Sequence, residues 1–343
     1  MGRLFEIIIL TLAGYVLIST LNEPHWTHSK LYHFVVYGLL AVGLYGSVYG
    51  IDTNKIKENR SIILTAITIG VLLKTIIIGL ILFAFTGEKI SFLLAIIVAQ
   101  IDPLSVVALE KDKQKLSDRG QLILNAWASF DDPITTLISV YLSSIILKGE
   151  ILIGQASFNY VTDFGINILF AASILLAHKI GKKNTYFDVI LLGISFVICV
   201  WFSMMLGIAI IGLFLRPNLK GYLEKGVNFA FYSSLILLGT LLIDGVSILH
   251  GLFLAIGAIL SQLVVGVLLT SKLEYKDRFY LAFAQQNGIT AIILSLLFES
   301  EENGIVAVVA PAILFINLGY LVSNKLLDYK FRNSVSKKNI ENP

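Results

Sequence analysis

Apolar residues fill the chain in long windows that are separated by short polar stretches. A window of about 20 apolar residues lets a helix cross ~30 Å of hydrocarbon. The first window has the length of a signal peptide, but no small-residue cleavage site follows it, so we expect it to remain a span. The windows predict twelve crossings, of which the eighth is short enough to be incomplete: 4–21, 30–50, 61–85, 90–109, 117–147, 158–178, 186–203, 204–216, 225–243, 250–271, 279–299 and 304–327.

Composition agrees with this pattern. The 343 residues are 56% hydrophobic and 14% charged, whereas about 25% of the residues of a soluble domain are charged. We therefore expect an all-α polytopic membrane protein that is not an enzyme, binds no nucleic acid and holds no resident cofactor. The single cysteine, Cys199, lies in an apolar run and is expected to be a buried, inert thiol.

Basic residues set the predicted orientation. Of the 26 Lys and Arg residues, 22 lie at the termini and in even-numbered loops, while only Lys30, Lys89 and Lys148 lie in odd-numbered loops. Cytoplasmic loops of membrane proteins carry such an excess of basic residues. Both termini are therefore predicted to be cytoplasmic, and we expect the protein in the plasma membrane.

Two of the predicted helices carry polar interruptions at mid-depth. One interruption is Gln100-Ile101-Asp102-Pro103, and the other runs from Gln285 through Gln286 and Asn287 to Gly288. They lie in three-helix units that begin at the third and tenth helices and would run in opposite directions. Inverted repeats with broken helices that cross at the midplane are typical of secondary transporters.

Three carboxylates are predicted inside the membrane: Asp102, Asp131 and Asp132. An Asp at the centre of a membrane helix costs about 2.5–3.5 kcal/mol on insertion scales, so it must be protonated, paired or hydrated. Pro103 and Pro133 lack an amide hydrogen, which frees the carbonyls of Ala99 and Ser129 beside these acids. One buried Asp can simply cap a helix break, but three acids on consecutive helices favour an oxygen-lined site for a small hard cation or a proton.

Adjacent helical residues point about 100° apart, so Asp131 and Asp132 cannot both face one ion. One of them is expected to be the principal ligand and the other an accessory group. Lys74 is the one basic residue at mid-helix depth; it either extends to the interface or forms a buried ion pair with Asp131 or Asp102. Candidate polar lining residues are Asn125, Ser105, Thr135, Gln285, Gln286 and Asn287, whereas Asp163, Asp188 and Asp244 fall near helix ends and are expected to face water or headgroups.

These residues resemble the cation:proton antiporters, in particular the sodium/proton exchanger branch, from about residue 32 to residue 327. The family's Thr-Asp-Pro-x-x-Val in the first broken helix is matched by Ile101 to Val106. Its Asn-Asp or Asp-Asp signature after Phe is matched by Phe130-Asp131-Asp132, and the segment 276–288 is similar to the entry to the second broken helix.

The resemblance implies that Asp132 carries the cation and the proton, and that Asp102 contributes at the helix crossing as a second candidate Na⁺ ligand. Asp131 takes the neighbouring position, which is Asn in electroneutral members and Asp in electrogenic ones. The exchanger domain would span 1–327, with a core of 61–147 and 250–327 that moves against dimerisation helices of 1–50 and 158–243. A homodimer and a short cytoplasmic tail of 328–343 are also implied.

Three positions depart from the family. Ile101 replaces the Thr before Asp-Pro, Asn287 stands where exchangers usually have Arg, and the tenth helix lacks an intramembrane Lys or Arg. Lys74 is a candidate replacement for that missing cation.

The predicted function is therefore antiport of protons against a monovalent cation, Na⁺ first, with K⁺ and Li⁺ as alternatives. Two other classes stay open: a non-transporting sensor or assembly subunit of the same fold, and a sodium-coupled symporter of an organic anion. The symporter predicts an enlarged polar cavity, and the sequence shows no obvious anion-binding Arg within the membrane.

Overall fold

The structure is a computed structural model that describes residues 2–21, 26–49, 51, 59–110, 112, 115–147, 149, 155–181, 185–219, 221–286 and 288–341. Its regular elements are helices, joined at one point by an isolated β-bridge. In chain order they are α1 (Gly2–Leu21), α2 (Lys30–Tyr49), α4 (Arg60–Thr65), the π-helical η2 (Ala66–Gly70), α5 (Val71–Thr86), α6 (Ser91–Val98), α7 (Pro103–Glu110), α8 (Asp118–Leu147), α9 (Gln155–Ile180), α10 (Thr185–Trp201), α11 (Met205–Phe214), α12 (Tyr222–Thr240), the 3₁₀ turn η3 (Leu241–Asp244), α13 (Ile248–Leu269), α14 (Tyr275–Ala282), α15 (Ile289–Glu299) and α16 (Ile305–Glu341).

Within these ranges a helical segment lies at each of the twelve predicted crossings. Eight of the described helices are long and apolar enough to span a membrane, and α10, α11 and α15 are shorter apolar helices. The ten residues of α11 reach only roughly 15 Å at 1.5 Å per residue. The prediction that the eighth crossing is incomplete is therefore confirmed, and the protein is an all-α polytopic membrane protein.

Both predicted helix breaks are present. One break separates α6 from α7, which begins at Pro103, and the other separates α14 from α15, which begins after Gly288. Ile101 pairs with Gln286 in an antiparallel bridge, and the Asp102 amide donates to the Gln285 carbonyl at 2.9 Å. Main-chain groups freed by the two breaks therefore satisfy each other, which backbone at membrane depth requires. The two broken helices cross at this point.

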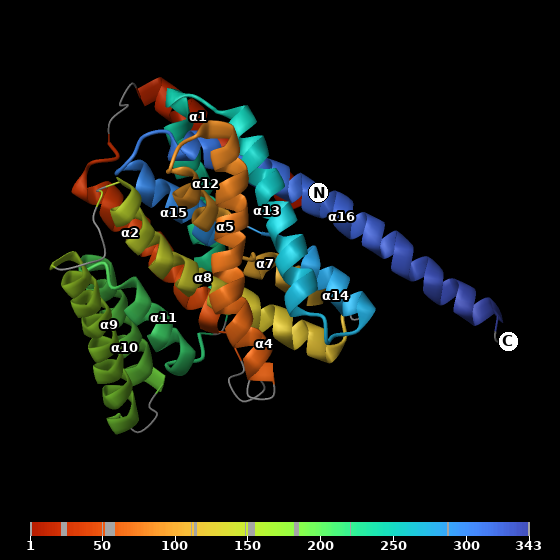
Figure 1. The fold of residues 1–343 in the computed structure, drawn as a ribbon. Coiled ribbons are helices and arrows are strands. Elements are labelled where there is room, and N and C mark those ends of the chain that lie inside the picture. Colours follow the sequence, from red (N-terminus) through yellow and green to blue (C-terminus); the bar gives the residue numbers. More distant parts are fainter. Residues whose placement is uncertain are drawn as a thin grey trace.

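The other helices form two packing neighbourhoods around the crossing. In the first, α1 packs along α12, and α2 contacts α11 and α12. In the second, α5 packs on α6 and α13, and α13 packs on α16. Figure 1 shows α9, α10 and α11 on the opposite side of the molecule from α13, α14 and α16. Helix α2 links the neighbourhoods through α8 and α15. The predicted division into a mobile core and a dimerisation part stays a prediction.

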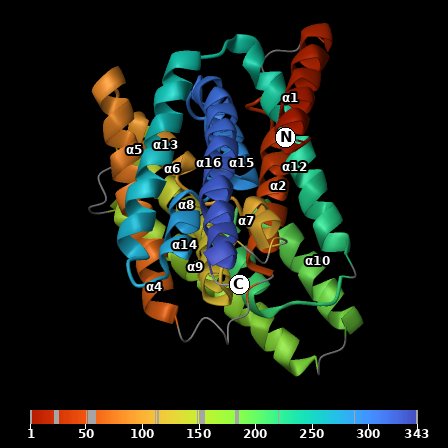
Figure 2. The ribbon, with the colours of Figure 1, turned by 90° about the vertical axis from the view of Figure 1, so that its right-hand side faces the viewer.

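Helix α16 continues through the segment predicted as a polar tail. It runs to Glu341 and extends beyond the rest of the bundle in Figure 1, and in the turned view of Figure 2 it lies in front of the other helices. No Gly or Pro interrupts residues 320–342, so the chain can remain helical after its apolar stretch ends.

Candidate functional site

Asp131 is held by a buried ion pair. The Lys74 ammonium donates to Asp131 Oδ2 at 2.9 Å, and both side chains are 0% exposed. The Ile101 amide in the first break donates to the same oxygen at 3.1 Å. The ammonium also lies 5.4 Å from the centre of the Trp127 ring, within cation–π range. The predicted pairing of Lys74 is confirmed with Asp131, and the interpretation that Lys74 extends to the interface is wrong.

The π-helical segment η2 lies directly before this pair. It runs without a break from α4 into α5, so Lys74 follows the widened turn by four residues. Each π turn rotates the following residues relative to a regular α-helix, and π segments are frequent at functional sites. Gly70 at the end of η2 allows close packing on Leu269 and Val265 of α13. The local geometry thus sets the direction in which Lys74 enters the bundle.

Asp132 has no such partner. Its side chain is 0% exposed, and neither carboxylate oxygen forms a hydrogen bond with any described residue. The hydroxyls of Thr290 on α15 and Ser47 on α2 lie nearby without meeting hydrogen-bond geometry. The charges that act most strongly on it are those of Asp102 and Asp131. Because a buried charge is normally paired or bound to a cation, Asp132 is the side chain here that most needs a ligand.

Asp102 begins α7 as its N-cap. Its Oδ2 accepts the Ser105 amide at 3.2 Å, and Pro103 takes the first helical position, where a missing N–H costs nothing. A Cβ added to Gly288 would lie 2.7 Å from Asp102 Oδ1. The second break therefore needs glycine beside this carboxylate because a side chain would displace it.

Arg3 is a site residue that the sequence did not indicate. Its guanidinium donates to Asp102 Oδ2, across from α1 to the first break. The sequence placed Arg3 among the cytoplasmic basic residues because it precedes the first apolar window. One signal could have found it: the departures at Asn287 and in the tenth helix leave the acids short of one cation.

Other buried polar atoms near the crossing also have no partner among the described residues. They include both amide atoms of Gln286, the Thr290 hydroxyl and the Thr136 hydroxyl one turn after Asp132. By contrast, the Gln285 amide donates to Asn317 at 2.8 Å, and the Thr135 hydroxyl donates to the Asp131 carbonyl at 2.8 Å. The unsatisfied oxygens belong to hydroxyl, amide and carboxylate groups, which are ligands for hard cations.

The remaining predicted residues have different outcomes. Pro133 lies inside the continuous helix α8, so the helix is not broken there. The Ser129 carbonyl still lacks the usual amide donor. Asn125 is half-buried on α8, about two turns before Asp132. Asn287 lies outside the described residues.

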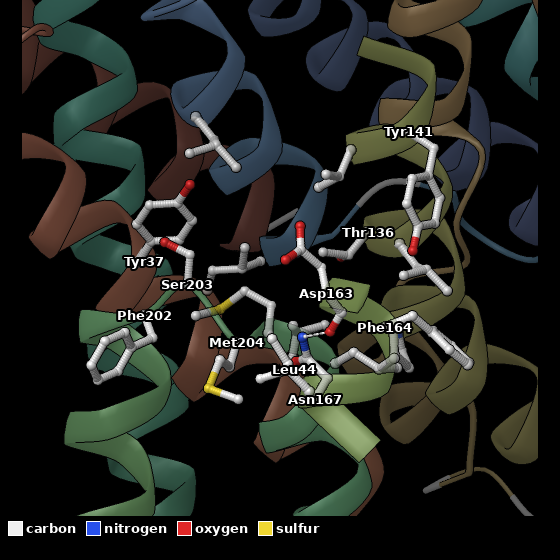
Figure 3. Close-up of a pocket in the computed structure, with 18 of the residues that line it drawn as sticks. Tyr37, Leu44, Thr136, Tyr141, Asp163, Phe164, Asn167, Phe202, Ser203 and Met204 are labelled. Carbon is white, nitrogen blue, oxygen red and sulfur yellow. Dashed lines mark hydrogen bonds between the residues drawn. The ribbon is translucent and has the colours of Figure 1, made fainter. Parts of the chain in front are cut away.

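Two of the cavities lined by described residues lie beside the crossing and are large enough to hold water. The larger has a volume of about 630 Å³ and reaches Pro133 and Thr136, next to Asp132. Asp163 is the one charged side chain among its described lining residues, and Figure 3 shows its carboxylate between Tyr37 and Tyr141. The smaller cavity, about 320 Å³, reaches Ser105 and Gln285 and contains Arg3.

Two acids predicted near helix ends behave differently from each other. Asp163 is exposed and lines the larger cavity. Asp188 is buried and lies 2.6 Å from His178 Nδ1, so the expectation that it faces water or headgroups is wrong. A histidine on the preceding helix, α9, supplies a partner that the sequence pattern did not reveal.

The three intramembrane acids do not form a cage for a metal ion. Among the described residues, no group of three or more His, Cys, Asp or Glu side chains is arranged to hold one. Asp102 and Asp131 each contact a cationic side chain, whereas Asp132 contacts none in the part of the chain that the structure describes. The arrangement can therefore bind one positive charge at Asp132, either a proton or a small cation.

The fold has a solved counterpart. The chain is similar in structure to the sodium proton antiporter MjNhaP1 from Methanocaldococcus jannaschii at pH 8, with a TM-score of 0.74 and 17% sequence identity over 92% of each chain. An electron-microscopy structure of MjNhaP1 gives a TM-score of 0.50 and 18% identity over 89% of this chain and 84% of that chain. No family model and no curated protein matches the chain. The likeness establishes a cation:proton antiporter fold.

Proposed function

We propose that this membrane protein exchanges protons for a monovalent cation, with Na⁺ as the first candidate, and that Asp132 binds the proton and the cation in alternation. The observation that carries the proposal is the Asp132 carboxylate, which is fully buried with both oxygens unpartnered among the described residues. Binding of a cation or a proton removes the free-energy cost of a buried carboxylate without a partner. The antiporter fold of the chain supports the same conclusion.

The two cavities support access from two sides. The larger one lies beside the C-terminal half of α8, and the smaller one lies beside α7 and the first turn of α1. Helix α8 and helix α1 are expected to begin on the same side of the membrane, so the cavities would open toward opposite sides. Movement of α8 together with the crossing helices would then carry Asp132 from one side to the other.

Transport in proteoliposomes tests the proposal. Vesicles that contain a pH-sensitive dye receive pulses of Na⁺, K⁺ or Li⁺, and wild-type protein is expected to release protons from an acidified lumen. Asp132→Asn keeps the side-chain shape and removes the exchangeable charge, so it should abolish the response. Asp188→Asn is the matched control because Asp188 is also buried but pairs with His178 away from the crossing.

Two outcomes would reject the proposal: a wild-type protein that moves no protons under any cation pulse, or an Asp132→Asn variant as active as wild type. A silent wild type would favour a sensor or assembly subunit. A sodium-coupled organic-anion symporter would respond only when its anion is added. No Lys or Arg lines the larger cavity among its described residues, and Arg3 in the smaller cavity is occupied by Asp102.

A further inference from the structure

The Arg3–Asp102 ion pair joins helices that otherwise meet mainly through α15 and α16. Arg3 lies in the first turn of α1, which packs along α12. Asp102 lies in the break between α6 and α7, whose main neighbours are α5 and α8, with smaller contacts to α13, α15 and α16. The pair is therefore a direct electrostatic contact between the α1–α12 pair and the crossing helices.

Arg3 reaches Asp102 from the smaller cavity. The Arg3 side chain is 28% exposed, whereas that of Asp102 is 0% exposed. The guanidinium also lies 5.0 Å from the centre of the Phe231 ring of α12, which holds it to the α1–α12 pair. Ser105 and Gln285, which line this cavity, both hydrogen-bond Asp102. The guanidinium thus stands between the cavity and the carboxylate.

We propose that Arg3 is a positioning residue that occupies Asp102 in place of an incoming cation and closes the smaller cavity in this conformation. The inference rests on the proposed antiport function and adds to it a residue that sets cation affinity on one face of the membrane. Arg3 must leave Asp102 before a cation can approach from the smaller cavity, and also whenever the crossing helices move relative to α1 and α12.

The chemistry of the pair suits a contact that forms and breaks. Hydrogen bonds between a guanidinium and a carboxylate are strong and directional. Because Arg3 keeps contact with the cavity, water can solvate it once it leaves, so the pair costs less to open than one enclosed on all sides. The Lys74–Asp131 pair is enclosed on all sides and is expected to stay formed.

Transport kinetics test the affinity effect. Arg3→Gln is expected to lower the apparent KM for Na⁺ by about tenfold, the factor that corresponds to 1.4 kcal/mol, and only when Na⁺ is added on the side of the smaller cavity. Two vesicle preparations, in which the protein is inserted in opposite orientations, allow KM to be measured from each side separately. Arg3→Lys restores the charge and should return KM toward wild type, while Arg60→Gln, at an exposed arginine on α4, is the control for charge loss.

A merely structural role for Arg3 predicts a different result. Loss of an anchor for α1 would reduce the maximal rate or the yield of folded protein and leave KM unchanged on both sides. That result would overturn the inference. In an Asp102→Asn background, Arg3→Gln should change KM no further, because the partner is already absent; an undiminished effect there also contradicts it.

Thiol labelling tests closure of the cavity without any transport. In a Cys199→Ala background, Ser105→Cys places a thiol at the inner end of the smaller cavity. A membrane-impermeant methanethiosulfonate reagent should label it about tenfold faster after Arg3→Gln or after Asp102→Asn, two independent ways to break the pair. Unchanged labelling in both variants overturns the inference. Faster labelling in a protein that moves no protons would retain the closure and reject the proposed function.

Discussion

At the scale of single residues, three identical acids differ by what faces them. Asp131 pairs with an enclosed ammonium, Asp102 caps a helix and pairs with a partly exposed guanidinium, and Asp132 has neither kind of partner among the described residues. The side-chain chemistry is the same, so the environments alone assign the roles. In this conformation the charged partners neutralise two positions, which leaves Asp132 as the position for the ion in the proposed exchange.

The Lys74–Asp131 pair gives a prediction at this scale. Lys74→Met leaves a buried carboxylate without a counter-charge, and breaking a buried pair on one side typically costs about 3–5 kcal/mol. Thermal unfolding in detergent should therefore show a clear loss of stability, most of which Lys74→Met/Asp131→Asn recovers. A double variant as unstable as the single one would mean that Lys74 acts through packing rather than through its charge.

The same substitution should shift the pH profile of exchange toward alkaline pH. Without the ammonium, release of the proton that competes with the cation becomes less favourable, so a higher pH is needed. An unchanged profile would show that Lys74 has no electrostatic effect on the site.

Sequence reasoning identified the site residues that are costly in a membrane. The insertion cost of Asp102, Asp131, Asp132 and Lys74 identifies them without any structure. Arg3 was missed because an arginine at a helix end is usually at the interface, and nothing in its local sequence indicates a partner about a hundred residues away. The distinction between Asp131 and Asp132 depends on which of them faces Lys74, which residue spacing alone does not specify.

At the scale of elements, two glycines allow α1 and α12 to approach each other closely. A Cβ on Gly14 would lie 2.0 Å from the Ile236 carbonyl oxygen, and one on Gly239 would lie 2.0 Å from the Thr11 carbonyl oxygen. Both obstacles are backbone atoms, so no side-chain rotation relieves them. Small residues of this kind let membrane helices approach closely.

Gly239→Ala is therefore expected to separate α1 from α12 and to destabilise the protein by about 1–3 kcal/mol, as overpacking does. Gly226→Ala on the same helix is the matched control because its Cβ would meet only ordinary contact at 4.0 Å from Val42. Unfolding of the two variants in one detergent compares them directly. Equal stability of the two would show that the helices can separate without cost.

Helix positions were predictable, and one detail of their winding was not. The apolar windows and the polar interruptions placed all twelve segments within the described ranges, including the short α11. The π-helical segment η2 was not predicted because residues 66–70 are mainly small and apolar, like much of the membrane sequence around them. Local residue preference therefore does not distinguish it from the α-helical turns on either side.

At the scale of the whole molecule, the charges around the crossing predict the stoichiometry. Among the described residues, three buried carboxylates face two cationic side chains, so the proposed exchange needs only one carboxylate that binds a proton and a cation in turn. One exchangeable proton per cation would make the exchange electroneutral, in contrast to the electrogenic exchange that the resemblance implies for an Asp at position 131. A Na⁺ pulse should then move protons without changing the signal of a potential-sensitive dye in the same vesicles. A sustained voltage would mean that a second acid, Asp131, also exchanges its proton.

The bridge between Ile101 and Gln286 has a consequence for the evolution of the molecule. The contact that holds the two broken helices together is made by main-chain amides and carbonyls, which every residue except proline supplies in full. Substitutions at these positions can therefore accumulate without uncoupling the two repeats. Side chains such as that of Ile101 can change while the crossing keeps its register. A shared architecture can in this way outlast recognisable sequence similarity.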